Sequence, residues 1–92
     1  MERYSILRAK RFVNKVDGKP DKVVYAFDMS DDIIKAHYYK LRLHQLDDGT
    51  WFIAFPAYEN QGTGKFYKYY WLDLKDYEKD IINEVIKLAN AD

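Results

Sequence analysis

The spacing of apolar residues changes once along this chain, near residue 73, and that change restricts the folds open to it. Before residue 73, aromatic and β-branched residues occur in short runs separated by Gly, Pro and Asp, a pattern typical of strands joined by turns. Beyond it, apolar residues recur every three or four positions, as they do on an amphipathic helix. The sequence therefore predicts an α+β fold: a five-stranded antiparallel β-sheet followed by one C-terminal amphipathic α-helix.

The predicted strands are separated by residues that favour turns. Asp17-Gly18 and Asp47-Asp48-Gly49 are typical of hairpin turns, Ser30 to Asp32 are read as a connection, and residues 58–64 as a longer loop. The strands between these turns cover residues 4–13, 22–29, 35–46, 50–56 and 65–72. A chain of 92 residues has room for one domain, so residues 1–92 are treated as a single unit.

The helix is predicted over residues 74–90. Its apolar stripe is formed by Leu74, Tyr77, Ile81, Val85 and Leu88. Asp73 has the side chain of a helix N-cap, and acidic residues in the first turns suit the positive end of the helix dipole.

Several functional classes are disfavoured by what the chain lacks. There is no Cys, which excludes disulfides, thiolate zinc sites and thiol catalysis. His37 and His44 are seven positions apart, an odd offset, which predicts opposite faces of one strand and no shared metal site. No catalytic constellation is visible, so we expect neither an enzyme nor a cofactor. No apolar run approaches membrane-spanning length and no signal peptide is evident, so we expect a cytoplasmic protein without a membrane partner.

The formal net charge is zero, but the charges are unevenly distributed. Residues 1–22 hold seven basic and three acidic side chains, a net charge of +4, which the remaining 70 residues cancel. Such a segment is either an ordinary solvated face or a surface for an anionic partner such as nucleic acid.

The nucleic-acid interpretation rests on basic residues interleaved with aromatic residues on strands. On the third strand, Lys40, Arg42 and His44 share one face, while Tyr39, Leu41 and Leu43 share the other. On the first strand, Arg8 and Lys10 share a face and Arg11 lies opposite. The candidate nucleic-acid-binding residues are Arg8, Lys10, Arg11, Lys40, Arg42, Lys65 and Lys68.

The aromatic content exceeds what one helix can cover. A single helix shields only one face of a sheet, yet the fourth and fifth predicted strands are apolar or aromatic on both faces. We therefore expect a homodimer that buries the surplus surface, with a bound partner or ligand as the alternative. The candidate interface residues are Trp51, Phe52, Phe55, Tyr67, Tyr69 and Trp71.

The order of these motifs resembles that of the stage V sporulation protein G (SpoVG) family. The similar segments are Leu41-Arg42-Leu43, the turn ending at Gly49, Phe52-Ile53-Ala54-Phe55-Pro56, and Lys65-Phe66 after a polar loop. The resemblance extends to Leu7–Phe12 and the Asp17-Gly18-Lys19 turn. It implies a small dimeric regulator with a curved antiparallel sheet and a C-terminal helix, binding DNA and, in some members, RNA.

Two segments depart from that family pattern. The loop of residues 57–61 carries no basic side chain, and residues 74–80 are mostly acidic where the family has a basic segment. The alternative hypothesis is therefore a protein–protein interaction module, for example a phage-type or regulatory inhibitor of a host protein. Neutral net charge, an acidic helix and many tyrosines favour that alternative, because Tyr and Trp are enriched at interface cores.

Overall fold

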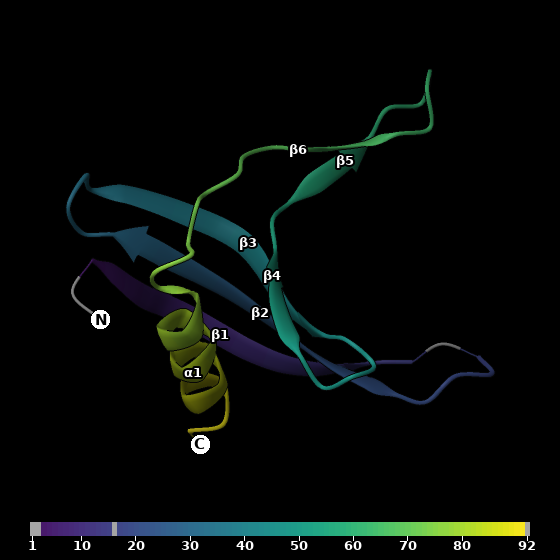
Figure 1. Cartoon of the computed structure of the whole chain (residues 1–92), viewed down its shortest axis with the longest axis horizontal. Helices are drawn as coiled ribbons and strands as arrows, with labels where there is room; N and C mark the ends of the chain where they lie inside the picture. Colours follow the sequence, from purple (N-terminus) through teal and green to yellow (C-terminus); the bar gives the residue numbers. More distant parts are fainter. Residues whose placement is uncertain (1–2, 16, 92) are drawn as a thin grey trace.

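A computed structural model describes residues 3–15 and 17–91 as a four-stranded sheet, a separate two-stranded ribbon and one helix. The strands are β1 (Tyr4–Asn14), β2 (Lys22–Asp31), β3 (Ala36–Gln45), β4 (Trp51–Ala54), β5 (Ala57–Glu59) and β6 (Phe66–Lys68), and the helix is α1 (Glu78–Ala89). Strands β1 to β4 are antiparallel neighbours in chain order. Helix α1 packs mainly on β1, and the β5–β6 ribbon projects away from the sheet (Figure 1).

The α+β class, the antiparallel sheet and the C-terminal helix are confirmed, but the prediction of five strands in one sheet is wrong. Of residues 65–72, only β6 is a strand, and it pairs with β5, which overlaps the start of the loop predicted over residues 58–64. Pro56 explains the change, because it follows the short strand β4 and has no N–H to continue the ladder. The chain therefore leaves the sheet and forms its own hairpin. We call residues 57–69 the arm.

Two bulges bend the sheet on either side of Asp28. The β1–β2 register slips between Ile6 and Arg8, and the β2–β3 register slips opposite Tyr39 and Lys40. Lys40 adopts the left-handed conformation (φ 65°), and its backbone N–H donates to the Asp28 carboxylate at 3.0 Å. The Asp28 side chain thus satisfies an amide that the irregular ladder leaves free.

The β3 bulge corrects two predictions about faces. Tyr38, rather than Tyr39, packs with Leu41 and Leu43 against the core, and Tyr39 is 53% exposed. His37 and His44 were predicted on opposite faces, but the extra residue between them places both on the face away from the core. Three or more metal-ligating side chains do not gather anywhere in residues 3–15 and 17–91.

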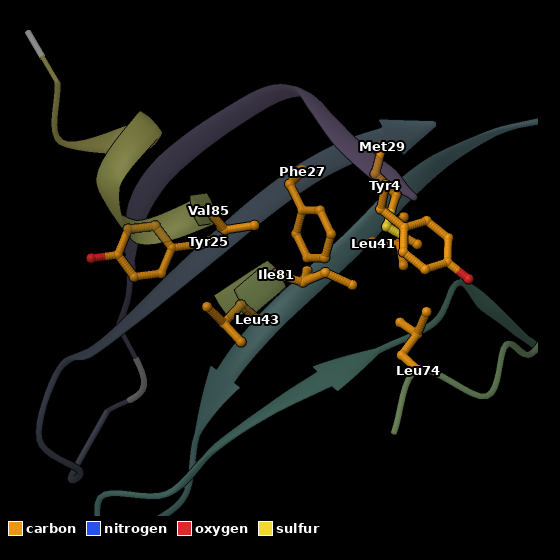
Figure 2. Close-up of a cluster of buried hydrophobic side chains, with 9 residues drawn as sticks. All are labelled: Tyr4, Tyr25, Phe27, Met29, Leu41, Leu43, Leu74, Ile81 and Val85. Atoms are coloured by element: carbon orange, nitrogen blue, oxygen red, sulfur yellow. The ribbon is translucent and has the colours of Figure 1, made fainter. Parts of the chain in front are cut away.

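The core lies between the sheet and α1. Ile81 and Val85 are completely buried against side chains of β2 and β3, which include Tyr25, Phe27 and Leu43 (Figure 2). Each such side chain contributes about 1.5–3 kcal/mol by burial. The apolar stripe of the helix is confirmed over these residues, whereas Leu88 at its end is 44% exposed.

The helix begins four residues later than predicted. Asp73 is not the N-cap; its carboxylate accepts the Lys75 backbone N–H at 3.2 Å, and Tyr77 occupies the cap position. Leu74 enters the core instead of the helix, and the Tyr77 N–H donates to the Leu74 carbonyl at 2.9 Å. Residues 74–77 are therefore a turn that anchors the start of α1.

Strand β2 extends through Ser30 and Asp31, which were predicted to lie in a connection. Asp31 is almost fully buried and pairs with the Arg3 guanidinium at 2.9 Å. It also accepts the backbone N–H groups of Ile33 and Ile34. These donors, Arg3 first, hold the pKa of Asp31 below its usual range.

Two further sequence expectations have a structural counterpart. Gly49 closes the β3–β4 hairpin with a positive φ of 92°, as the predicted turn requires. Gly18 lies in the turn between β1 and β2 with a positive φ of 76°, while Val16, at the start of the segment predicted to turn, falls outside the described residues. No helix in the described part of the chain combines the length and apolar character needed to cross a membrane.

Candidate nucleic-acid interface

The face of the sheet opposite α1, here called the outer face, carries a row of basic and small residues. Lys10, Ala26, Arg42 and Ala54 are register partners and form one row across all four strands. Partners across a ladder point to the same side, so both cations project from the outer face. Neighbouring strands lie about 4.8 Å apart, which separates the Lys10 and Arg42 backbones by about 10 Å. The short side chains of Ala26 and Ala54 leave a shallow surface beside the long side chains of Lys10 and Arg42.

A second basic pair lies beside that row. Arg8 is the register partner of Asp28, and Lys40 lies across from them at the bulge. A hollow of about 190 Å³ lies among these residues. It is lined by Arg8, Lys10, Ala26, Phe27, Asp28 and Lys40. The outer face thus carries four cations, Arg8, Lys10, Lys40 and Arg42, whose charge the carboxylate of Asp28 offsets only in part.

A groove of about 450 Å³ separates the outer face from the base of the arm. One wall comes from β3, where the cations Lys40 and Arg42 lie beside the imidazole of His44. The opposite wall comes from the chain leaving β4, at Pro56, and from Tyr69 at the end of the arm. Tyr69 is 68% exposed, and its ring lies 5.1 Å from that of Tyr58. An aromatic surface therefore faces a basic one across the groove.

Aromatic rings also lie on the outer face itself. His44 is the register partner of Phe52, and their rings stack at 5.4 Å with an interplanar angle of 20°. The Arg42 guanidinium lies 5.5 Å from the centre of the Phe12 ring on β1. Phe52 and Phe12 thus border the basic row.

His44 has a lowered pKa. Burial is the main cause, and the positive charges of Arg42 and Lys22 act in the same direction. At neutral pH the imidazole of the free protein is therefore uncharged. An anion placed in the groove would oppose these effects and favour the charged form.

Tyr70 anchors the arm to the sheet. Its hydroxyl donates to the backbone carbonyl of Tyr39 at 2.8 Å, within the β3 bulge. Its ring packs on Tyr38 at 5.5 Å and on Phe55 at 5.7 Å. Burial raises the pKa of Tyr70 to about 12, with the nearby Asp28 charge as a second cause. These contacts hold the end of the arm against β3 and Phe55.

The predicted basic residues divide into three groups. Arg8, Lys10, Lys40 and Arg42 come together on the outer face. Arg11 is the register partner of Tyr25 and lies on the helix side of the sheet, opposite to Lys10 as the alternation predicts. Lys65 and Lys68 belong to the arm, where the Lys68 ammonium lies 5.7 Å from the Phe55 ring.

The candidate interface residues are also divided. Trp51 and Phe55 are partly buried and pack against the core, with Trp51 5.7 Å from Tyr25. Phe52 lies on the outer face, Tyr67 and Tyr69 lie on the arm, and Trp71 is exposed just beyond it. The groove therefore combines Tyr69, expected at a protein interface, with Lys40 and Arg42, expected to bind nucleic acid.

Sequence reasoning missed Phe12, Pro56 and Asp28 as parts of this surface. The position of Phe12 follows from the same alternation as Lys10, and Pro56 is a visible end to its strand. Asp28 had no comparable signal, because its role depends on two bulges.

No family model, curated protein or solved structure matches the chain.

Proposed function

We propose that this chain is a small homodimeric regulatory protein that binds nucleic acid through the outer face, as the resemblance to SpoVG implies. The observation that supports this most strongly is the gathering of Arg8, Lys10, Lys40 and Arg42 on one face, bordered by exposed rings. Lys and Arg side chains bind phosphates, and aromatic rings stack on bases.

The zero net charge is compatible with this proposal because the charges are separated in space. The acidic residues of α1, Glu78, Asp80 and Glu84, belong to the layer that covers the opposite face of the sheet. A nucleic acid on the basic row of the outer face would therefore meet the four cations and the carboxylate of Asp28. With so few phosphate contacts, binding should be modest and strongly dependent on salt.

The homodimer is proposed from surface that a monomer leaves uncovered. Phe66 on the arm is 73% exposed and Trp71 is 63% exposed. The arm strands have three residues each, and a two-stranded hairpin of this size is at best marginally stable alone. Strand β4 also lies at a sheet edge, open to further pairing. Light scattering should give twice the chain mass; a monomer at micromolar concentration would contradict the dimer.

Fluorescence anisotropy with labelled oligonucleotides tests nucleic-acid binding. We expect affinity to fall at least tenfold between about 50 and about 200 mM salt, as release of counterions from a few phosphates requires. The double variant Lys10→Gln/Arg42→Gln should lose most binding. The matched variant Lys75→Gln/Lys79→Gln removes the same charge near α1 and should bind normally.

Absence of binding at low salt would refute the proposal, as would equal losses in the two double variants. A protein that copurifies after nuclease treatment, combined with no affinity for oligonucleotides, would support the protein-interaction module instead. The exposed arm is the surface that would then bind the partner.

A further inference from the structure

We infer that the groove between the outer face and the arm binds unpaired, single-stranded nucleic acid in preference to a duplex. This inference rests on the proposed function and specifies its substrate class. It starts from the two kinds of surface that the groove brings together, a basic wall from Lys40 and Arg42 and an aromatic wall from Tyr69.

The exposed rings favour unpaired bases. The Tyr69 ring and the edge of the His44–Phe52 stack are available on the same side of the sheet, with Phe52 37% exposed. A ring can stack only on a base whose flat face is free. In a duplex those faces are covered by neighbouring base pairs, whereas a single strand can turn its bases onto protein rings. A duplex could use the cations of this surface but not its rings.

The size of the groove agrees with this occupant. A space of about 450 Å³ lies in the range of sites for small molecules, about 300–1,000 Å³, which suits a nucleotide unit. Pro56 and Tyr69 close one side of the groove, so the bound strand has to bend past them. A single strand has the free backbone torsions to do so, whereas a duplex is stiff over about 150 base pairs.

The basic residues give the strand a path along the sheet. Lys10 and Arg42 lie in one row, with only Ala26 between them, and Arg42 also lines the groove. A backbone held at Lys10 and Arg42 can therefore deliver the next base to Tyr69. Ala54 continues the row toward the arm without a side chain that would block this path.

The test compares labelled oligo-dT and oligo-U of about 15 nucleotides with a duplex of the same length, a size matched to known single-strand sites. Both single strands should bind at least tenfold more tightly than the duplex. The contacts named here involve phosphates and ring faces, which DNA and RNA share, so neither sugar is required for the result.

Substitution of the groove tyrosine separates stacking from folding. Tyr69→Ala should weaken single-strand binding about 5- to 100-fold, the effect of losing one stacked base, and leave duplex binding unchanged. Tyr69→Phe keeps the ring and should bind like the parent protein. Phe52→Ala on the sheet gives an independent variant, with the same selective loss expected.

The outcomes distinguish this inference from the proposed function. A duplex that binds as tightly as the single strands overturns the inference but leaves nucleic-acid binding intact. Tyr69→Ala and Phe52→Ala proteins that are folded and bind single strands normally overturn it as well. If none of the three probes binds at low salt, the proposed function itself fails.

Discussion

Replacing Tyr70 with Phe removes one hydroxyl from the anchor of the arm and keeps the ring. The lost hydrogen bond joins that hydroxyl to the Tyr39 carbonyl at 2.8 Å. Such a bond contributes about 0.5–1.5 kcal/mol, so we expect Tyr70→Phe to lower the free energy of unfolding by about 1 kcal/mol at pH 8. For a domain of this size the midpoint of thermal unfolding should fall by about 4–8 °C.

The same substitution has a specific pH dependence. The pKa of Tyr70 is raised to about 12 in the folded protein, from its ordinary value of about 10. The folded state holds this proton more tightly, so the associated stability is complete below pH 10 and is lost as pH rises from 10 toward 12. A two-unit shift at a fully buried site would correspond to about 2.7 kcal/mol; partial exposure of the ring reduces it to about 1 kcal/mol.

Urea unfolding followed by tryptophan fluorescence measures both effects. The parent protein should exceed Tyr70→Phe by about 1 kcal/mol at pH 8, and this difference should shrink toward zero by about pH 11.5. Equal stabilities at pH 8, or a difference that does not change with pH, would refute the role given to the Tyr70 hydroxyl.

Three further results are expected. Ile81→Ala removes most of a fully buried side chain and leaves a cavity, so it should lower the free energy of unfolding by about 2–5 kcal/mol. Ile82→Ala should lower it clearly less, and equal losses in thermal unfolding would contradict the packing of α1. Asp31→Asn should lower the free energy of unfolding at neutral pH. Because the pKa of Asp31 is lowered, its stabilising contribution is complete above the unfolded value near 3.8 and is lost below it, so the variant should lose less stability in acid than the parent protein. Parallel loss of stability in acid by the two proteins would count against the pairing with Arg3. Oligonucleotide affinity should rise as pH falls from about 7.5 to about 5.5, because phosphate favours protonated His44. The variant His44→Phe should reduce that rise, and an unchanged pH profile in the variant would remove His44 from the site.

The elements predicted correctly from the sequence are those whose signals are local. The alternation from Leu41 to His44 in β3, beyond the bulge, and the apolar stripe with Ile81 and Val85 depend only on neighbours within the same segment. The prediction of a fifth strand in the main sheet was wrong because Tyr67 and Tyr69 alternate in the same way whether their segment joins that sheet or pairs with β5. Which strand a segment pairs with is a property of the tertiary fold, and here Pro56 decides it.

The basic residues of the candidate surface could be named from the sequence, but their arrangement could not. The alternation that places Lys10 and Arg42 on polar faces does not say that they share a row; that follows from the registers of two ladders. The β3 bulge has no clear sequence signal either, because Lys40 takes a positive φ that usually selects Gly or Asn. This bulge brings Lys40 and Asp28 together and reverses the predicted relation of His37 to His44.

The most direct test of the proposed binding surface is an NMR titration of the ¹⁵N-labelled protein with oligo-dT at low salt. We expect amide shifts concentrated on the outer-face residues of β1 and β3, around Lys10 and Arg42, and at Tyr69 on the arm, with α1 largely unaffected. Shifts confined to α1, or no shifts at saturating oligonucleotide, would contradict it.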